Sequence, residues 1–109
     1  GVPCAWVIQN ESRMSGYLLK AAEQDALAAI DWSEGYLEPG EYVDADLGWT
    51  ISPHGVAEVP RIKRQAFDLT TSYARIAEGD VGAVYMLAAR ARTNTGRDLE
   101  RSIVLRIAA

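Results

Sequence analysis

The chain contains one histidine and one cysteine, His54 and Cys4, whose side chains suit acid–base, nucleophilic or metal chemistry. A Ser-His-Asp site would depend wholly on His54, which lies in the turn-like stretch Ser52-Pro53-His54-Gly55. A zinc site would need carboxylates for its remaining ligands, and the sequence offers no suitable acidic cluster. We therefore expect a solvated loop histidine, no metal and no cofactor.

Acid pairs such as Asp44 and Asp46 are candidates for general acid–base work. They are two residues apart in a stretch flanked by Gly and Pro, and they share a strand-like face, where carboxylates are ordinarily solvated. A single cysteine also allows no disulfide within the chain, which excludes a disulfide-stapled secreted scaffold. We expect no enzymatic activity.

Length and charge limit the domain count and the kinds of partner. The 109 residues suffice for one domain, and the net charge of -4 argues against a partner bound mainly through phosphates. No apolar run approaches the ~20 residues that a membrane span requires. The basic residues nevertheless crowd the last quarter of the chain, at Arg90, Arg92, Arg97, Arg101 and Arg106.

The first residues raise a separate question. Residues 1–13 precede Met14-Ser15-Gly16, which resembles a natural translation start. They are either a leader, a cloning remnant or an over-called start, or an N-terminal arm that docks on a neighbour through Trp6, Val7 and Ile8.

The apolar pattern predicts an all-β chain after its first segment. Residues 17–30 contain good helix formers without Gly or Pro, so we expect a short helix or irregular arm to about residue 25 and then a strand. Residues 1–25 would then be the arm or leader, and residues 26–109 the folded domain. Within that domain, Leu47, Trp49 and Ile51 alternate with small or polar residues as in a half-buried strand.

Further strands are predicted at regular intervals between turn signals. Residues 56–59 suggest a short strand, residues 67–76 extended structure, and residues 83–93 and 99–107 the two longest strands. About seven strands separated by turns favour an immunoglobulin-like β-sandwich.

The last two predicted strands allow a register to be worked out. A three-residue loop Asn94-Thr95-Gly96, with Gly96 in the left-handed conformation, pairs residue 87 with 103 and residue 85 with 105, apolar with apolar. On the other face it sets Arg90 opposite Glu100. A two-residue loop would oppose apolar positions to polar ones, so the three-residue loop is favoured.

The outer face of this hairpin is the candidate interface. Its charges can neutralise one another, which makes a solvated face one interpretation. The second interpretation is a contact surface, because apolar residues lie beside the arginines, and such a mixture suits a protein interface better than a nucleic-acid groove. The candidate interface residues are Val84, Met86, Arg90, Arg92, Val104 and Arg106.

Three aromatic residues carry specific expectations. Tyr85 follows Gly79-Asp80 at a spacing that suits a tyrosine corner, although a plain core aromatic is the alternative. Trp49 is expected in the core. Trp32 is expected either in the core or as an exposed ligand platform with Tyr36 and Tyr42.

Two sets of short motifs resemble those of small phage tail proteins labelled fiber-tail adaptor. The first set is Ile30-Asp31-Trp32-Ser33, Leu37, Pro39-Gly40-Glu41 and Trp49-Thr50-Ile51. The second set is Glu78-Gly79, Gly82, Tyr85, Thr93-Asn94-Thr95-Gly96-Arg97 and Glu100-Arg101-Ser102-Ile103. The similarity covers about residues 28–107.

This resemblance implies an immunoglobulin-like virion component without catalytic activity, with other phage tail proteins as partners. We expect it to be a homo-oligomer in the virion, present in the host cytoplasm during assembly, and to bind neither nucleic acid nor membrane. The alternative function is an immunoglobulin-like module that binds carbohydrate or a cell surface.

Overall fold

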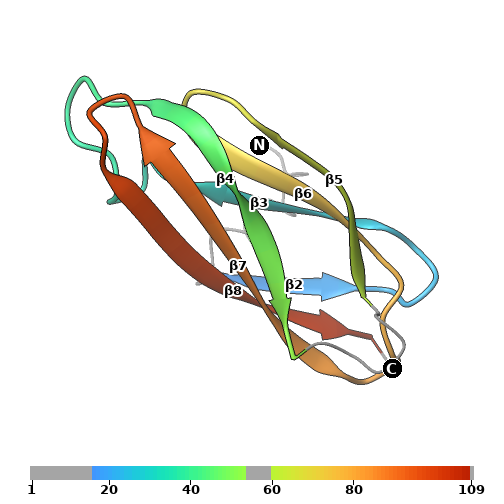
Figure 1. The fold of residues 1–109 in the computed structure, drawn as a ribbon. Helices are drawn as coiled ribbons and strands as arrows, with labels where there is room; N and C mark the ends of the chain where they lie inside the picture. Colours follow the sequence, from blue (N-terminus) through green and yellow to red (C-terminus); the bar gives the residue numbers. More distant parts are fainter. Residues whose placement is uncertain (1–15, 54–59, 109) are drawn as a thin grey trace, which may run out of the picture.

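The computed structural model describes residues 16–53 and 60–108, which form two packed β-sheets (Figure 1). The four-stranded sheet has the order β2 (Tyr17–Lys20), β8 (Asp98–Ile107), β7 (Val84–Thr93) and β4 (Val43–Ser52). The three-stranded sheet has the order β3 (Ala26–Asp31), β6 (Thr71–Ala77) and β5 (Arg61–Phe67). β2 runs parallel to β8, and the other neighbours are antiparallel. The predicted immunoglobulin-like sandwich of about seven strands is confirmed.

The short helix or irregular arm expected to about residue 25 is wrong at residues 17–20, which form a strand. Tyr17–Lys20 instead pairs with Val104–Ile107, and the described part of the chain contains no helix. The segment alternates between the faces of the sheet, with Leu18 partly buried and its neighbours Tyr17 and Leu19 exposed. Helix propensity amounts to a few tenths of a kcal/mol per residue, so pairing with a long strand and burial of one face override it. Residues 17–20 are therefore part of the sandwich.

Lys20, the last residue of β2, points inward with 2% of its surface exposed. Its ammonium donates hydrogen bonds to the carbonyl oxygens of Ala21 and Ala22, at 2.9 and 3.2 Å. Burial lowers the pKa of Lys20, against the opposing effect of the nearby carboxylates, of which Asp25 is the largest contributor. These two bonds close the turn that leads from β2 into β3.

The extended run expected over residues 67–76 is interrupted. β5 ends at Phe67 and β6 begins at Thr71, because Asp68 closes a tight turn between them. The Asp68 carboxylate accepts the backbone N–H groups of Thr70 and Thr71 at 3.0 and 2.9 Å. An Asp side chain that bonds to the backbone two or three residues ahead favours such a turn over a continuous strand. The short strand predicted at 56–59 and the arm or leader predicted at 1–13 lie outside the described residues.

The core lies between the sheets and is lined by alternate residues of each strand. Trp32, directly after β3, is fully buried and donates from Nε1 to Ser72 Oγ at 2.9 Å. Trp49 on β4 is 6% exposed, which confirms its predicted core position. From β7 and β8, the core receives Tyr85, Leu87, Ala89, Ala91, Leu99, Ile103, Leu105 and Ile107.

The register predicted for the last hairpin is confirmed at every position. Leu87 pairs with Ile103, and Arg90 with Glu100. The three-residue loop is closed by the Thr93 N–H, which donates to the Arg97 carbonyl at 2.9 Å. Gly96 has φ 90°, a backbone conformation that residues with a Cβ rarely adopt.

The tyrosine corner is also confirmed. The Asp80 N–H donates to the phenol oxygen of Tyr85 at 3.2 Å, and Tyr85 is 6% exposed. This bond fixes the turn that enters β7, and so sets where the hairpin begins.

Candidate interaction face

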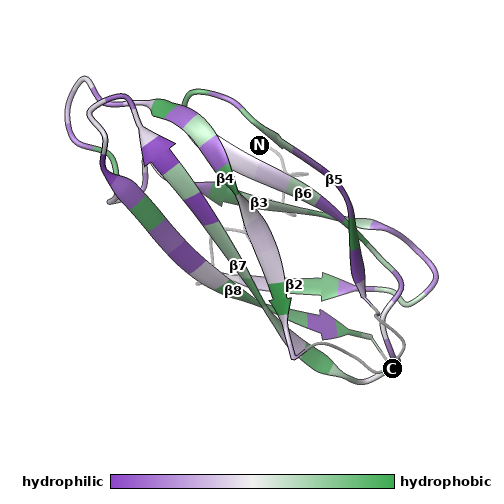
Figure 2. Ribbon diagram, in the orientation of Figure 1, coloured by the Kyte–Doolittle hydropathy of each residue, from purple (hydrophilic) through white to green (hydrophobic). Residues whose placement is uncertain are grey.

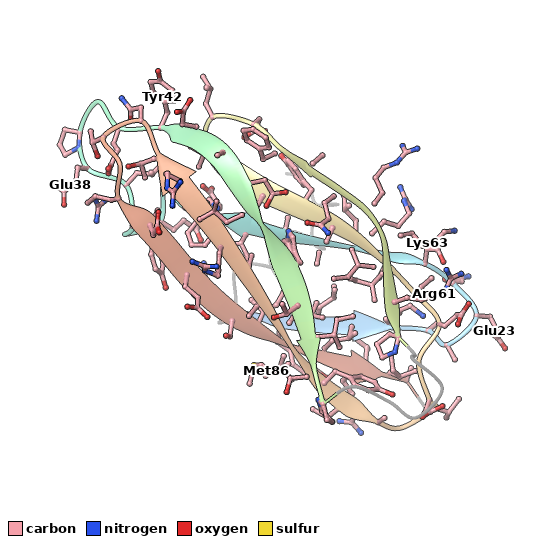
Figure 3. The ribbon with its side chains drawn as sticks, viewed as in Figure 1. Glu23, Glu38, Tyr42, Arg61, Lys63 and Met86 are labelled. Carbon is pink, nitrogen blue, oxygen red and sulfur yellow. The ribbon has the colours of Figure 1, made fainter. Side chains whose placement is uncertain are left out.

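The candidate site is the outer face of the four-stranded sheet. Successive side chains of a strand point to opposite faces, so the burial of one set on β7 places the other set in solvent. The six residues of the candidate interface all lie on this outer face, on adjacent strands β7 and β8. Figure 3 labels Met86 at the surface of β7, away from Arg61 and Lys63 on the other sheet.

One end of the face is apolar. Val84 is 57% exposed and Met86 is 43% exposed, and Val104 lies beside Met86 in the register. The structure adds two residues that the sequence analysis missed: Tyr17 is paired with Val104, and Leu19 with Arg106. They were missed because the segment was expected to be helical or irregular, and Tyr17-Leu18-Leu19 is apolar at consecutive positions, without the alternation that indicates a half-buried strand.

We call the five outward-facing apolar residues at this end of the face the apolar block. Its members are Tyr17, Leu19, Val84, Met86 and Val104. In Figure 2 the start of β7 has the colour of hydrophobic residues, whereas the hairpin end of β7 and β8 alternates with hydrophilic ones.

The hairpin end of the face is charged. Arg92 donates to Asp98 from Nε and Nη2, at 2.8 and 3.3 Å, which lowers the pKa of Asp98 and raises that of Arg92. Arg90 and Glu100 are register partners directly across the two strands. Among the described residues, the ion pairs within 4.0 Å involve Arg61, Lys63, Arg92 and Arg97 as cations. Arg90 is therefore an outward arginine that makes no ion pair within 4.0 Å in the described structure.

A buried carboxylate supports this end of the sandwich. Glu41, in the loop between β3 and β4, has 2% of its side chain exposed. It accepts two bonds from Arg97, at 2.6 and 2.9 Å, and one from Thr95 Oγ1 at 2.6 Å. These donors, Arg97 foremost, hold the pKa of Glu41 far below its ordinary value.

This Glu41–Arg97 contact joins two segments that are far apart in the sequence. Arg97 also donates to the carbonyl of Tyr36 at 2.7 Å. Figure 1 shows the loop after β3 beside the β7–β8 hairpin at one end of the molecule, and Figure 3 labels Glu38 and Tyr42 there. Arg97, expected from the sequence only as one of the crowded arginines and as part of a family-like motif, thus positions the hairpin.

The aromatic platform considered for a carbohydrate ligand does not form around Trp32. Its indole is fully buried and meets the Tyr36 ring edge-on, with centroids 5.4 Å apart. The guanidinium of Arg101 lies 5.8 Å from the centre of the Tyr36 ring and covers it. Tyr42 is 41% exposed. Of the two positions expected for Trp32, the core is the correct one.

The residues considered for catalysis do not come together in the described structure. Asp46 accepts the N–H of Gly48 at 2.9 Å, a local bond within an irregular part of β4, and Asp44 is exposed. Within residues 16–53 and 60–108, no three His, Cys, Asp or Glu side chains gather closely enough to hold a metal ion. His54 and Cys4 lie outside the described residues.

Most of the strands that carry this face are also those that a known family shares. The family model described as podophage GP4 fiber-tail adaptor protein gp77 matches residues 20–106, from the end of β2 to the end of β8. The chain belongs to this family. The resemblance to phage fiber-tail adaptors over about residues 28–107 is thereby confirmed, and the fiber-tail adaptor match reaches further toward the N-terminus. No curated protein sequence matches the chain.

The gp77 family match takes in most of the candidate face. It includes β7, β8 and β4, and leaves Tyr17 and Leu19 just before its start. None of the residues that the structure describes belongs to a helix long and apolar enough to cross a membrane.

Proposed function

We propose that this chain is a non-enzymatic structural protein of the phage virion, which joins neighbouring tail proteins through the outer face of its four-stranded sheet. The family match supports a tail fiber adaptor. The observation that carries the choice of surface is the apolar block, with Val84 and Met86 about half exposed.

The apolar block is unusual for a face of this kind. An antiparallel sheet that packs on a core with one face normally presents polar side chains on the other. Here four strands contribute to one outer face, and its apolar end lies next to arginines, a combination found at the centre and rim of protein interfaces. Exposed apolar patches of this sort mark contact sites on soluble domains.

The remaining expectations follow from this role. Tail proteins act in repeated copies, so the chain works as part of a homo-oligomeric assembly whose other partners are phage tail proteins. Its net charge of -4 disfavours nucleic acid as the partner. It is present in the host cytoplasm during assembly and then in the virion.

Complementation of a phage that lacks this gene tests the proposal. The wild-type chain should be detected in purified particles by mass spectrometry, and the particles should carry fibers. Met86→Asp places a charge in the apolar block without touching the core, so particles made with it should lack fibers and infect poorly. Leu69→Asp is the matched control, because Leu69 is 63% exposed in the turn between β5 and β6.

Two results would overturn the proposal. One is a wild-type chain that is absent from purified particles. The other is a set of Met86→Asp particles that carry fibers and infect as well as the Leu69→Asp particles do.

A further inference from the structure

The outer face has an internal complementarity across β7 and β8. Three outward residues of β7 stand beside a β8 residue of matching character: Arg92 beside Asp98, Arg90 beside Glu100, and Met86 beside Val104, whereas Val84 stands beside Arg106. Ala88 and Ser102, the pair in the middle, are both small. The face is therefore charged at one end, flat at its centre and apolar at the other end.

Such cross-strand pairs have a consequence for symmetry. Consider a two-fold axis that lies on the face, parallel to β7 and β8 and midway between them. It places β7 of a second copy over β8 of the first at the same height along the strands. Every β7 residue then faces, on the second copy, the same kind of residue that stands beside it in its own chain. We infer that the outer face binds a second copy of this chain about this axis.

The charges favour this arrangement. Arg90 and Glu100 are register partners without an ion pair within 4.0 Å in the described structure, so both remain available to a second copy. About the axis, Arg90 of each copy faces Glu100 of the other, which gives two symmetric pairs. Arg92 and Asp98 meet their counterparts in the same way, and two like charges never face each other across β7 and β8. An isologous interface requires this self-complementarity.

The apolar end and the edges of the sheet also match. Met86 faces Val104 of the second copy, and Val84 packs on the aliphatic stem of Arg106, which can cover apolar surface while its charge stays in water. The axis sets β2 over β4, because β2 lies one strand outside β8 and β4 one strand outside β7. Tyr17, Val104, Met86 and Ser52 are successive register partners across the four strands, so they lie at the same height along the sheet. Tyr17 of one copy therefore meets the end of β4 of the other copy, near Ser52.

The size of the face suits a pair of modest affinity. Three of its strands have ten residues each. Together with β2 they present on the order of 500–600 Å² to a sheet stacked about 10 Å away. A standard interface buries about 800 Å² per partner, so we expect self-association in the micromolar range rather than a permanent dimer.

This inference rests on the proposed function in one respect, the use of the outer face as a contact surface. Its test needs only the purified chain. Sedimentation velocity of the wild-type chain up to about 100 μM should show a monomer–dimer equilibrium. Arg90→Glu and Glu100→Arg, each alone, should raise the dimer Kd by about 10-fold or more, since like charges then face each other across the axis.

An equal mixture of the two variants gives the decisive result. In a mixed pair, the glutamate introduced at position 90 of one copy faces the arginine introduced at position 100 of the other. The native Glu100 and Arg90 that remain also face each other, so the mixture should form dimers that neither variant forms alone. Ala88→Arg adds bulk at the centre of the face without changing any of these charges, and it should also give a monomer. Arg75→Glu is the control, because Arg75 is exposed on the other sheet, and it should leave the dimer unchanged.

A wild-type chain that stays monomeric to the highest concentration overturns the inference. If such a monomer still restores fibers to particles, the face binds a different tail protein and the proposed function stands. A wild-type dimer that persists in Ala88→Arg, or single variants whose mixture stays monomeric, also overturns the inference, because the dimer then uses another surface.

Discussion

At the level of single residues, Glu41 ties the hairpin that carries the candidate face to the loop after β3. Its carboxylate receives Arg97 and Thr95 from the β7–β8 loop and the backbone N–H of Glu38 from its own loop. A carboxylate with this many donors is held in its charged form. The hairpin end of the face therefore depends on one ion pair whose carboxylate is buried.

This arrangement predicts an acid-sensitive fold. The pKa of Glu41 in the folded state lies below its ordinary value of 4.5, so the unfolded state binds more protons at low pH. The stabilisation by Glu41 is fully present above pH 4.5 and is lost as the pH falls below that value. Asp98 and Asp68, whose pKa values are also lowered, act in the same direction.

Glu41→Gln tests this contribution through thermal unfolding at a series of pH values. We expect a melting temperature several degrees lower than wild type at pH 7, and a smaller further decrease between pH 5 and acid. The reason is that the amide cannot lose stabilisation by protonation. Glu38→Gln serves as the control, since the Glu38 side chain is exposed and the bond to Glu41 comes from the Glu38 backbone N–H, which the substitution keeps. Equal pH profiles for wild type and Glu41→Gln would contradict the assignment.

At the level of elements, the β7–β8 hairpin is the part of the fold that local rules describe best. The length of its loop sets the register of the two strands, and the register decides which side chains point into the core. A shift by one residue would expose Leu87 and Leu105, which are completely buried in the structure. The register is thus held by burial on one face and by charge pairs on the other.

Arg90→Glu probes this register in the isolated chain at a concentration where it is monomeric. It should lower the free energy of unfolding by no more than about 1–2 kcal/mol, because the introduced carboxylate and that of Glu100 would then be like charges directly opposite each other. The double variant Arg90→Glu, Glu100→Arg should recover most of that loss in urea unfolding. A double variant no more stable than the single one would show that the two positions do not interact.

β2 illustrates an element that local rules describe poorly. Its four residues belong to a segment rich in helix formers, yet they pair in parallel with the end of β8, more than eighty residues away. The Val104 N–H donates to the Gly16 carbonyl at 2.7 Å, which starts the pairing. β2 bears on the proposed function because it adds Tyr17 and Leu19 to the apolar block.

At the level of the whole molecule, the sandwich keeps one core and leaves its faces available for contact. On β7, Leu87 points into the core and its neighbour Met86 points to the surface. A substitution at Leu87 should therefore reduce stability, and a substitution at Met86 should reduce assembly. Stability should depend on the inward set, and fiber attachment on the outward set.

Leu87→Ala tests this division by urea unfolding. Leu87 is fully buried between the sheets, so its truncation should lower the free energy of unfolding by about 2–5 kcal/mol. Leu69→Ala, at a position 63% exposed, should change it by less than about 0.5 kcal/mol. Similar losses in the two variants would mean that the inward set on β7 is not the core.

The amino-acid sequence by itself determined the all-β class, the register of the last hairpin and the core position of Trp49, and it offered the tyrosine corner as one of two interpretations of Tyr85. These features depend on residues close together in the chain: alternation along a strand, the length of a loop, or the spacing of Asp80 and Tyr85. Steric and hydrogen-bonding rules act over that range, so the sequence pattern is sufficient.

Only the tertiary structure decided the state of Tyr17–Lys20, the partner of Glu41 and the place of Trp32. Glu41 and Arg97 are 56 positions apart, and Trp32 and Ser72 are 40 apart. Contacts at such separations depend on which strands pack together, and the resulting burial outweighs local propensity. For this reason the apolar block, assembled from β2, β7 and β8, was only partly visible before the sheets were in place.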